Sequence, residues 1–358
     1  MASERGTVLV LVLLIVALVA ALSVKFAAQY QLGLARAETR WHGAQARAFL
    51  EGTEEVAKLL FPDADLDREA DYLGEPWAAE VPIEDEGVTG VARLVDATAQ
   101  FNLNDLYSGT GFPEIPPGQA QRYTEPQRRF IRLLQTFPDI PLQEDQAIHL
   151  LEAVVDWIDP DNNESGQGGA EVNYYQGMPQ PYQPANALFK SVDELRLIKG
   201  FNENPMLVLR LMPFITVLPQ AGVGMNINTI DPVSPTGKGV NNLLRTINDQ
   251  NSLLPASESE VEFAFKSRKD TWFQNDAEIQ NAFMGKSVEM LNRQTYFFWL
   301  YSTVQIVDQR RSMRSLMTRA ELNGRPSLTV IRREDVYELP SVIRTDEKDE
   351  DGDTELVE

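Results

Sequence analysis

The residues in this sequence that are best suited to chemistry are oxygen-bearing side chains in the loop that follows the segment AVVDWI. Asp159, Asp161 and Asn163 alternate along this loop, and a glycine-rich stretch, SGQGG, separates them from Glu171. Calcium binds about six to eight oxygens from carboxylates, amides and backbone carbonyls, so alternating Asp and Asn side chains can converge on one ion where a loop curls. The sequence therefore contains a candidate calcium loop.

The loop also has two other interpretations. It resembles the start of an EF-hand, but Glu164 stands at the position of the EF-hand glycine, and Glu171 lies one position beyond the usual last Glu. It can equally be a turn without metal, because Asp, Asn and Gly favour turns for local reasons. A second polar stretch, 96–105, is a source of further ligands or of helix caps, and we favour caps.

Composition limits the classes of function. The chain has 53 acidic and 32 basic residues, and its net charge of −21 repels nucleic acid and anionic lipid. It contains no cysteine, which excludes a thiol nucleophile and thiolate metal ligands, and His42 and His149 are too few for a typical zinc site. The sequence lacks the G-x-S-x-G, H-E-x-x-H and P-loop motifs, so it gives little support to an enzyme.

An uncharged apolar run, Thr7 to Val24, follows the polar leader MASERG. Its length is slightly short of the about 20 residues that a membrane helix needs, but usable. Three interpretations compete: a removable secretory signal, a plain membrane anchor, and a prepilin-like leader cleaved between Gly6 and Thr7. The poor signal-peptidase site near Ser23 and the Arg5-Gly6 pair favour the prepilin leader.

The remaining pattern predicts the elements that would position the candidate loop. Apolar residues spaced by three or four continue the helix to about residue 60, and Val88 to Val95 reads as a strand. A mostly helical block follows, and then a meander of three antiparallel strands closed by the Asn323-Gly324 turn. The predicted helices span 125–136, 143–157, 191–198, 204–214, 240–247 and 257–264, with a hairpin turn in 218–229 and a helix start at Asn228 or Thr229; the last strands span 293–307, 309–322 and 327–333.

Several short motifs occur in a characteristic order. They are the leader and apolar helix, the strand before Asp96, FNLN at 101–104, DWIDPD at 156–161, GAE at 169–171, SVDELRLI at 191–198, NINT at 226–229 and the Tyr296-Phe297 start of the closing strands. Together they resemble the large minor pseudopilin of type II secretion systems, the K-type subunit. The resemblance covers nearly the whole chain and rests on the order of the motifs.

The resemblance implies an α+β fold in which a pilin-like long N-terminal helix packs on a small antiparallel sheet. A large, mostly helical domain is inserted into that sheet. The implied divisions are a prepilin leader at 1–6, a transmembrane and amphipathic helix at 7–60, the first part of the sheet at 61–100, the inserted domain at 101–285, closing strands at 286–340 and a disordered acidic tail at 341–358.

The resemblance also implies that the inserted domain binds structural calcium. Asp159, Asp161 and Glu171 match the implied ligand set best. Asp156, Asn163 and Asn173 match it less closely. No open coordination position for catalysis is implied, so we expect no enzymatic activity.

Most pilin-like proteins carry a Glu at the fifth mature position, thought to neutralise the amino terminus of a neighbouring subunit. With cleavage after Gly6, that position is Leu11. K-type subunits share this departure, which suits a subunit at the filament tip with no neighbour above it. Thr7 departs from the commoner Phe or Met at the first mature position, a residue that is methylated in this class.

The implied function is that of a tip subunit which initiates pseudopilus assembly with I- and J-type minor pseudopilins and helps to export folded proteins across the outer membrane. The protein would cross the inner membrane once, keep its bulk in the periplasm and be processed by prepilin peptidase. Secreted substrates and the outer-membrane secretin are further candidate partners, and nucleic acid is not. Two alternatives are a minor pilin of another type IV filament system and a membrane-anchored extracytoplasmic hydrolase.

Overall fold

The computed structural model describes residues 3–336 except 66–68, 86, 110, 236–238, 267–271 and 308, with side chains from residue 8 onward. The predicted disordered tail at 341–358 lies outside the described residues. So do Met1 and Ala2 of the predicted leader, and the side chain of Thr7, which follows Gly6 at the predicted cleavage site.

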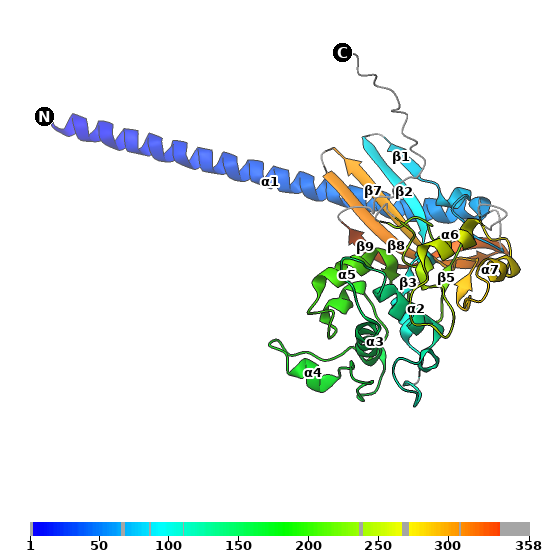
Figure 1. Cartoon of the computed structure of the whole chain (residues 1–358). Coiled ribbons are helices and arrows are strands. Elements are labelled where there is room, and N and C mark those ends of the chain that lie inside the picture. The colour runs from blue at the N-terminus through cyan, green and yellow to red at the C-terminus, as the bar shows by residue number, and fades with distance from the viewer. Residues whose placement is uncertain are drawn as a thin grey trace, which may run out of the picture.

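One long helix, α1 (Ser3–Ala64), projects far beyond the rest of the protein (Figure 1). Its apolar residues from Val8 to Val24 are exposed, and it is long and apolar enough to cross a membrane. The helix continues past the predicted end at 60, although Pro62 lies inside its last turn. Tertiary packing explains the extra turn, because Phe61 is buried with its ring 5.2 Å from that of Phe298.

The last third of α1 packs on a five-stranded antiparallel sheet with the order β1-β2-β7-β8-β9. Ala46 and Leu50 lie against Val304 and Met313 at one end of this interface. The strands are β1 (Val81–Asp85), β2 (Val88–Asp96), β7 (Phe297–Ile306), β8 (Gln309–Leu322) and β9 (Arg325–Val336).

Two strands differ from the predictions. The sequence pattern missed β1, because this strand contains Pro82 and shows little alternation of apolar and polar residues. Proline is tolerated there because β1 is an edge strand, where the missing backbone N–H costs no hydrogen bond within the sheet. β7 begins at Phe297 and not at Arg293. The Arg293 side chain instead donates to Asp276 and to the carbonyl oxygen of Gln274, which ties this segment to the helical region.

A mostly helical region lies between β2 and β7 and has its own hydrophobic core, with Phe130, Leu151 and Phe201 at its centre (Figure 1). Two short parallel pairs, β3 (Phe101–Asn102) with β4 (Ile215–Thr216) and β5 (Met225–Asn226) with β6 (Leu291–Asn292), brace this region. Its helices are α2 (Glu125–Leu134), α3 (Glu144–Ile158), α4 (Val172–Gln176), α5 (Pro205–Leu211), α6 (Glu258–Lys266) and α7 (Asp276–Ala282).

Two local predictions in this region are wrong, and two predicted helices are of another type. No helix starts at Asn228, because its side-chain amide bonds both the N–H and the carbonyl of Phe273 and holds an irregular segment. The segment 218–229 is not a hairpin, since β5 pairs with the distant β6 in parallel. The helices expected at 191–198 and 240–247 are short 3₁₀ turns, Val192–Leu197 and Leu244–Thr246.

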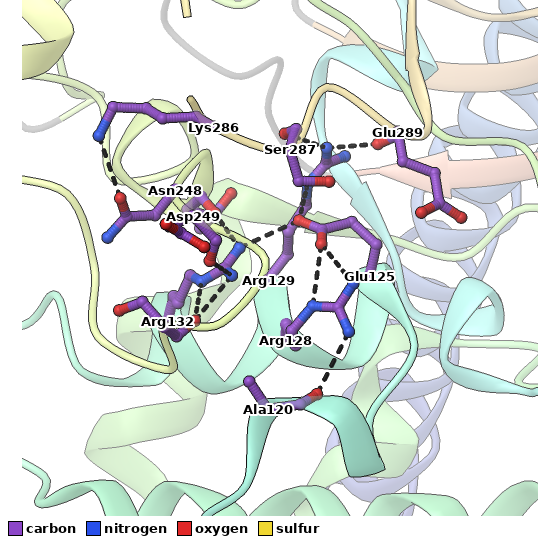
Figure 2. A network of polar contacts seen from close by, with 12 residues as sticks. Ala120, Glu125, Arg128, Arg129, Arg132, Asn248, Asp249, Lys286, Ser287 and Glu289 are labelled. Carbon is purple, nitrogen blue, oxygen red and sulfur yellow. Dashed lines mark hydrogen bonds and ion pairs between the residues drawn. The ribbon is translucent and has the colours of Figure 1, made fainter. Parts of the chain in front are cut away.

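A buried ionic network fixes α2 to the loops around it (Figure 2). Arg128, Arg129 and Arg132 all lie within ion-pair distance of the buried Glu125. Arg132 also donates to the carbonyl oxygens of residues 246, 249 and 252, and Arg129 donates to that of Glu289. The planar guanidinium groups thus satisfy backbone carbonyls that no helix or strand pairs.

Candidate metal centre

Helix α3 delivers the first carboxylates of the candidate loop. A capping box of Gln143 and Gln146 begins the helix, and Pro160 cannot continue it beyond Asp159, its C-cap. Trp157 anchors the end of the helix, because its indole N–H donates to Glu194 and its ring lies edge-on to that of Tyr175 at 5.4 Å.

The structure brings together the three carboxylates that matched the implied ligand set best. One oxygen each from Asp159, Asp161 and Glu171 lies within 4.8 Å of the other two. Asp159 and Glu171 are buried, and Asp161 is exposed. Among the described residues, Oδ1 of Asp159 and both carboxylate oxygens of Glu171 are buried without a hydrogen-bond partner.

The cluster is electrostatically unfavourable by itself. Burial, and then repulsion from Asp161 and Asp156, raises the pKa of Asp159 to about 6. Burial and the same acidic neighbours raise the pKa of Glu171 to about 7. Orphaned buried oxygens and mutual repulsion both disappear if a cation binds between the side chains. An all-oxygen donor set suits calcium and not zinc, which prefers nitrogen and sulfur ligands.

Asp156 has a different place from the cluster. Its carboxylate accepts hydrogen bonds from the backbone N–H groups of Ser165 and Ala170, at 3.0 and 2.7 Å. It is fully buried, and burial raises its pKa to about 6. Asp156 therefore fixes the shape of the loop, because its carboxylate oxygens already accept hydrogen bonds from the loop backbone.

The glycines of SGQGG allow the loop to lie directly on α3. A Cβ atom at Gly168 would lie 2.2 Å from the Cα of His149, and one at Gly169 would lie 2.4 Å from a carboxylate oxygen of Asp156. The N–H of Gly168 also donates to Glu152 of α3 at 2.8 Å. This close approach carries Glu171 back to the end of α3, where Asp159 lies.

The two asparagines predicted less closely as ligands lie at the edge of the centre. Asn163 donates from its backbone and side-chain nitrogens to Oδ1 of Asp161, at 2.8 and 2.9 Å, and so orients that carboxylate. Asn173 is exposed in the first turn of α4, outside the three-carboxylate cluster.

Sequence reasoning missed Asn186. Its side-chain nitrogen donates to the carbonyl oxygen of Asp161 at 3.1 Å, and its backbone N–H donates to that of Trp157 at 3.0 Å. Its Oδ1 is buried and has no hydrogen-bond partner among the described residues. Its φ of 42° is a conformation that Asn tolerates better than most residues, but the sequence carries no other signal for its position.

The second polar stretch acts as caps, as we expected. Oδ1 of Asp96 accepts from the N–H of Thr98 at 2.7 Å, and Oδ1 of Asn102 accepts from that of Asn104.

Leu11 is exposed on the projecting part of α1.

Comparisons with known proteins relate this chain to one protein family. The model of a family described as type II secretion system (T2SS), protein K, matches residues 99–220, which include the candidate loop. The type II secretion system protein K of Aeromonas hydrophila is 33% identical over 233 residues, which are 64% of this chain and 68% of the relative. That of Pseudomonas aeruginosa is 31% identical over 234 residues, or 63% of this chain and 65% of the relative.

A solved structure has a similar fold. The match is to a chain from the crystal structure of the GspK-GspI-GspJ complex of enterotoxigenic Escherichia coli, with a TM-score of 0.68 and 19% sequence identity. It covers 85% of this chain and 100% of that chain. The predicted α+β fold, with a pilin-like helix, an antiparallel sheet and a helical insertion, is confirmed by this similarity and by the element order.

Proposed function

Because this chain belongs to the type II secretion system protein K family, we propose that it is the minor pseudopilin at the tip of the pseudopilus. There it starts assembly with I- and J-type minor pseudopilins and helps to export folded proteins across the outer membrane. One observation carries the proposal: a pilin-like helix and sheet bear a helical region between β2 and β7 that is larger than the sheet itself. The similar chain of known structure comes from a GspK-GspI-GspJ complex.

The bulk of the helical region supports a place at the tip. It spreads to one side of the sheet (Figure 1), and a body of this width would obstruct close stacking of identical subunits along a thin filament. Leu11 supports the same place. A carboxylate there would be costly in hydrocarbon without a partner, and a subunit at the top has no neighbour above to supply one.

The exposed apolar part of α1 supports a single crossing of the inner membrane, with the bulk of the chain in the periplasm. Before assembly, prepilin peptidase would cleave between Gly6 and Thr7, and Thr7 would become methylated. The helix would then leave the membrane and enter the filament core. Mass spectrometry of the mature amino terminus tests this order of events, and retention of Met1 would contradict it.

The candidate metal centre would hold structural calcium. Asp159, Asp161 and Glu171 would bind it, and Asn186, whose amide nitrogen bonds the carbonyl oxygen of Asp161, would offer its orphaned Oδ1 as a further donor. When bound, calcium supplies the positive charge that this cluster lacks. Asp156 and Asn163 would orient the loop and leave ligation to the other residues. Calcium would thus join α3 to the loop before α4.

The protein would have no enzymatic role, and it would act by contact alone. Secreted substrates and the outer-membrane secretin are the further partners that a subunit at the tip would meet. The net charge of −21 disfavours nucleic acid as a partner. The same features suit a minor pilin of another type IV filament system, whose partners would be that system's minor pilins.

Reconstitution with partners tests the proposal. The full chain in detergent is mixed with I- and J-type minor pseudopilins, and a ternary complex is expected on size exclusion. Trp41→Glu is expected to weaken the complex, because Trp41 is exposed on α1 where a neighbouring helix would pack. Phe263→Glu on α6 is the matched control, since this ring is as exposed as that of Trp41 but belongs to the helical region and not to α1. Separate elution of the three wild-type proteins would refute the proposal.

A further inference from the structure

Helix α1 carries a basic face just outside the sheet. Lys25, Arg36, Arg40 and Arg47 are separated by 11, 4 and 7 residues, which at about 3.6 residues per turn places them within an arc of about 60°. The acidic residue of this stretch, Glu38, points to the opposite side. All five side chains belong to the exposed part of the helix.

At its C-terminal end, near Arg47, this face borders a groove of about 430 Å³. One wall is α1, with Gly43 and Arg47, and the other is the start of β8, with Arg310 and Arg311. The two walls lie close together, since the Arg311 guanidinium is 3.9 Å from the position that a Cβ would take at Gly43. The groove thus continues the basic face onto the sheet.

The positive charge of the groove is largely unpaired. Within the part of the chain that the structure describes, neither Arg310 nor Arg311 forms an ion pair. Arg47 contacts Glu51 at 3.0 Å, but both side chains are exposed, and such a pair contributes only about 0.3–0.5 kcal/mol. Asp335 is the acidic residue in the groove lining. This surface is therefore positively charged in a protein whose net charge is −21.

The last strand of the sheet, β9, ends at the same groove. Val336, the last residue of β9, is one of the groove-lining residues. Residues 337–358 follow it, with nine Asp or Glu against two Arg or Lys, which gives a net charge of −7. The basic face from Arg47 to Lys25 extends about 33 Å along the helix, whereas this segment can reach about 70 Å when extended. The segment is therefore long enough to follow the whole face.

We propose that residues 337–358 dock on the basic face of α1 in the same molecule, from the groove at Arg310 and Arg311 toward Lys25. The attachment at Val336 makes the contact intramolecular, so weak individual attractions act at a high effective concentration. The docked segment covers one side of α1 and excludes any other acidic ligand from it. This inference concerns the chain alone and stands whether or not the protein assembles into a pseudopilus.

The absence of native cysteine makes the contact directly measurable. Thr39→Cys beside the basic face and Thr354→Cys in the acidic segment are labelled with nitroxides in the full chain. The protein is placed in nanodiscs of zwitterionic lipid, where its own acidic segment is the main polyanion. Electron double resonance is expected to give a population of short separations between labels. Raising the salt from about 0.05 M to about 1 M is expected to reduce this population at least about threefold, because charges are then screened within about 3 Å.

Charge variants separate docking from general attraction. The double variant Arg310→Gln with Arg311→Gln is expected to reduce the short population by a similar factor. The matched control, Arg196→Gln with Arg325→Gln, removes the same charge from exposed positions elsewhere and is expected to change nothing. Circular dichroism and melting temperature verify that each variant is folded.

Other results overturn the proposal. A broad distribution in wild type at low salt means that the segment does not dock. Equal losses in the groove and control variants mean that only total charge matters. A short population that disappears on tenfold dilution means that the segment reaches a second molecule and not its own helix.

Discussion

Oδ2 of Asp96, at the end of β2, accepts a hydrogen bond of 2.5 Å from the hydroxyl of Thr229 in the helical region. Thr295, just before β7, donates its hydroxyl to the same oxygen. The carboxylate is completely buried, so it depends on these donors in place of water. Asp96 therefore joins the sheet to the helical region at the point where the chain leaves one and enters the other.

Thr229→Val is expected to destabilise the protein by about 1–3 kcal/mol, because it keeps the shape of the side chain but leaves a buried carboxylate short of one donor. Urea unfolding measures the change. Thr318→Val is the control, since the Thr318 hydroxyl donates to the carbonyl oxygen of Tyr296 in a solvent-exposed hydrogen bond, and a change below about 0.5 kcal/mol is expected there. Equal effects at the two positions would mean that the Asp96 contact has no special role.

Asp71 makes the same joint sensitive to pH. Burial raises the pKa of Asp71 to about 7, against the attraction of Arg319 and with added repulsion from Asp65 and Asp96. The folded protein thus holds a proton that the unfolded chain releases near pH 4, and stability falls as the pH rises from about 4 to about 7. The contribution reaches at most about 1.4 kcal/mol per pH unit.

Asp71→Asn is expected to flatten this part of the stability profile. Urea unfolding at pH 5 and 7.5 in excess calcium measures the slope while the candidate metal centre stays constant. Asp139→Asn, which alters an exposed ion pair with Arg210, is expected to keep the wild-type slope. A wild-type slope in Asp71→Asn would show that other groups cause the pH dependence.

The buried network of α2 predicts a large effect at Glu125. Glu125→Gln keeps the volume but removes the anion shared by Arg128, Arg129 and Arg132, and the last two are buried. Removal of one partner from a buried ion pair costs about 3–5 kcal/mol, because uncompensated charge remains inside. We expect a loss of this size in the free energy of unfolding.

Glu260→Gln provides the contrast. Hydrogen bonds from Lys286 and Ser257 lower the pKa of Glu260 to about 2, but its side chain is 52% exposed. Solvent screens such a pair, and a loss below about 1 kcal/mol is expected. Similar losses at Glu125 and Glu260 would mean that the α2 network is hydrated and not truly buried.

Local sequence patterns predicted the long helix, the closing meander and α3 well. These elements have strong helical or alternating periods, and Asn323-Gly324 is a strong turn signal. The edge strand β1 was not predictable, since its pairing with β2 decides its conformation more than its own residues do. The Asn228 error has a similar cause, because the side chain bonds Phe273, which is 45 positions away.

The candidate metal centre shows the same limit. The spacing of Asp159, Asp161 and Asn163 indicated a metal loop, and the family resemblance added Glu171, which the structure brings to Asp159 and Asp161. Asp156 has the right chemistry and position in sequence, but its oxygens face backbone N–H groups. Spacing alone cannot show this orientation. Asn186 reaches the loop only through tertiary structure, and its contribution could be seen only after folding brought it to Asp161.

Calcium is expected to stabilise the protein, and the effect should depend on Asp159. At about 100 times the dissociation constant, binding adds about 2.7 kcal/mol to the free energy of unfolding. Asp159→Asn is expected to abolish the rise in melting temperature on addition of calcium. In chelator, the same variant is expected to melt above wild type, because it removes one of three mutually repelling carboxylates.

Asp156→Asn should behave differently, and the difference distinguishes a ligand from a residue that shapes the loop. The Asn side chain keeps one oxygen but places an N–H₂ donor against the backbone N–H groups of Ser165 or Ala170. The variant is therefore expected to melt below wild type both in calcium and in chelator. Asp193→Asn, an exposed position on the neighbouring 3₁₀ turn, is expected to match wild type in both conditions. The opposite result is that calcium shifts the melting temperature of none of these proteins and that Asp159→Asn has the wild-type melting temperature in chelator. The loop is then an Asx-rich turn without metal. Three carboxylates that repel one another would have to respond to one of these changes.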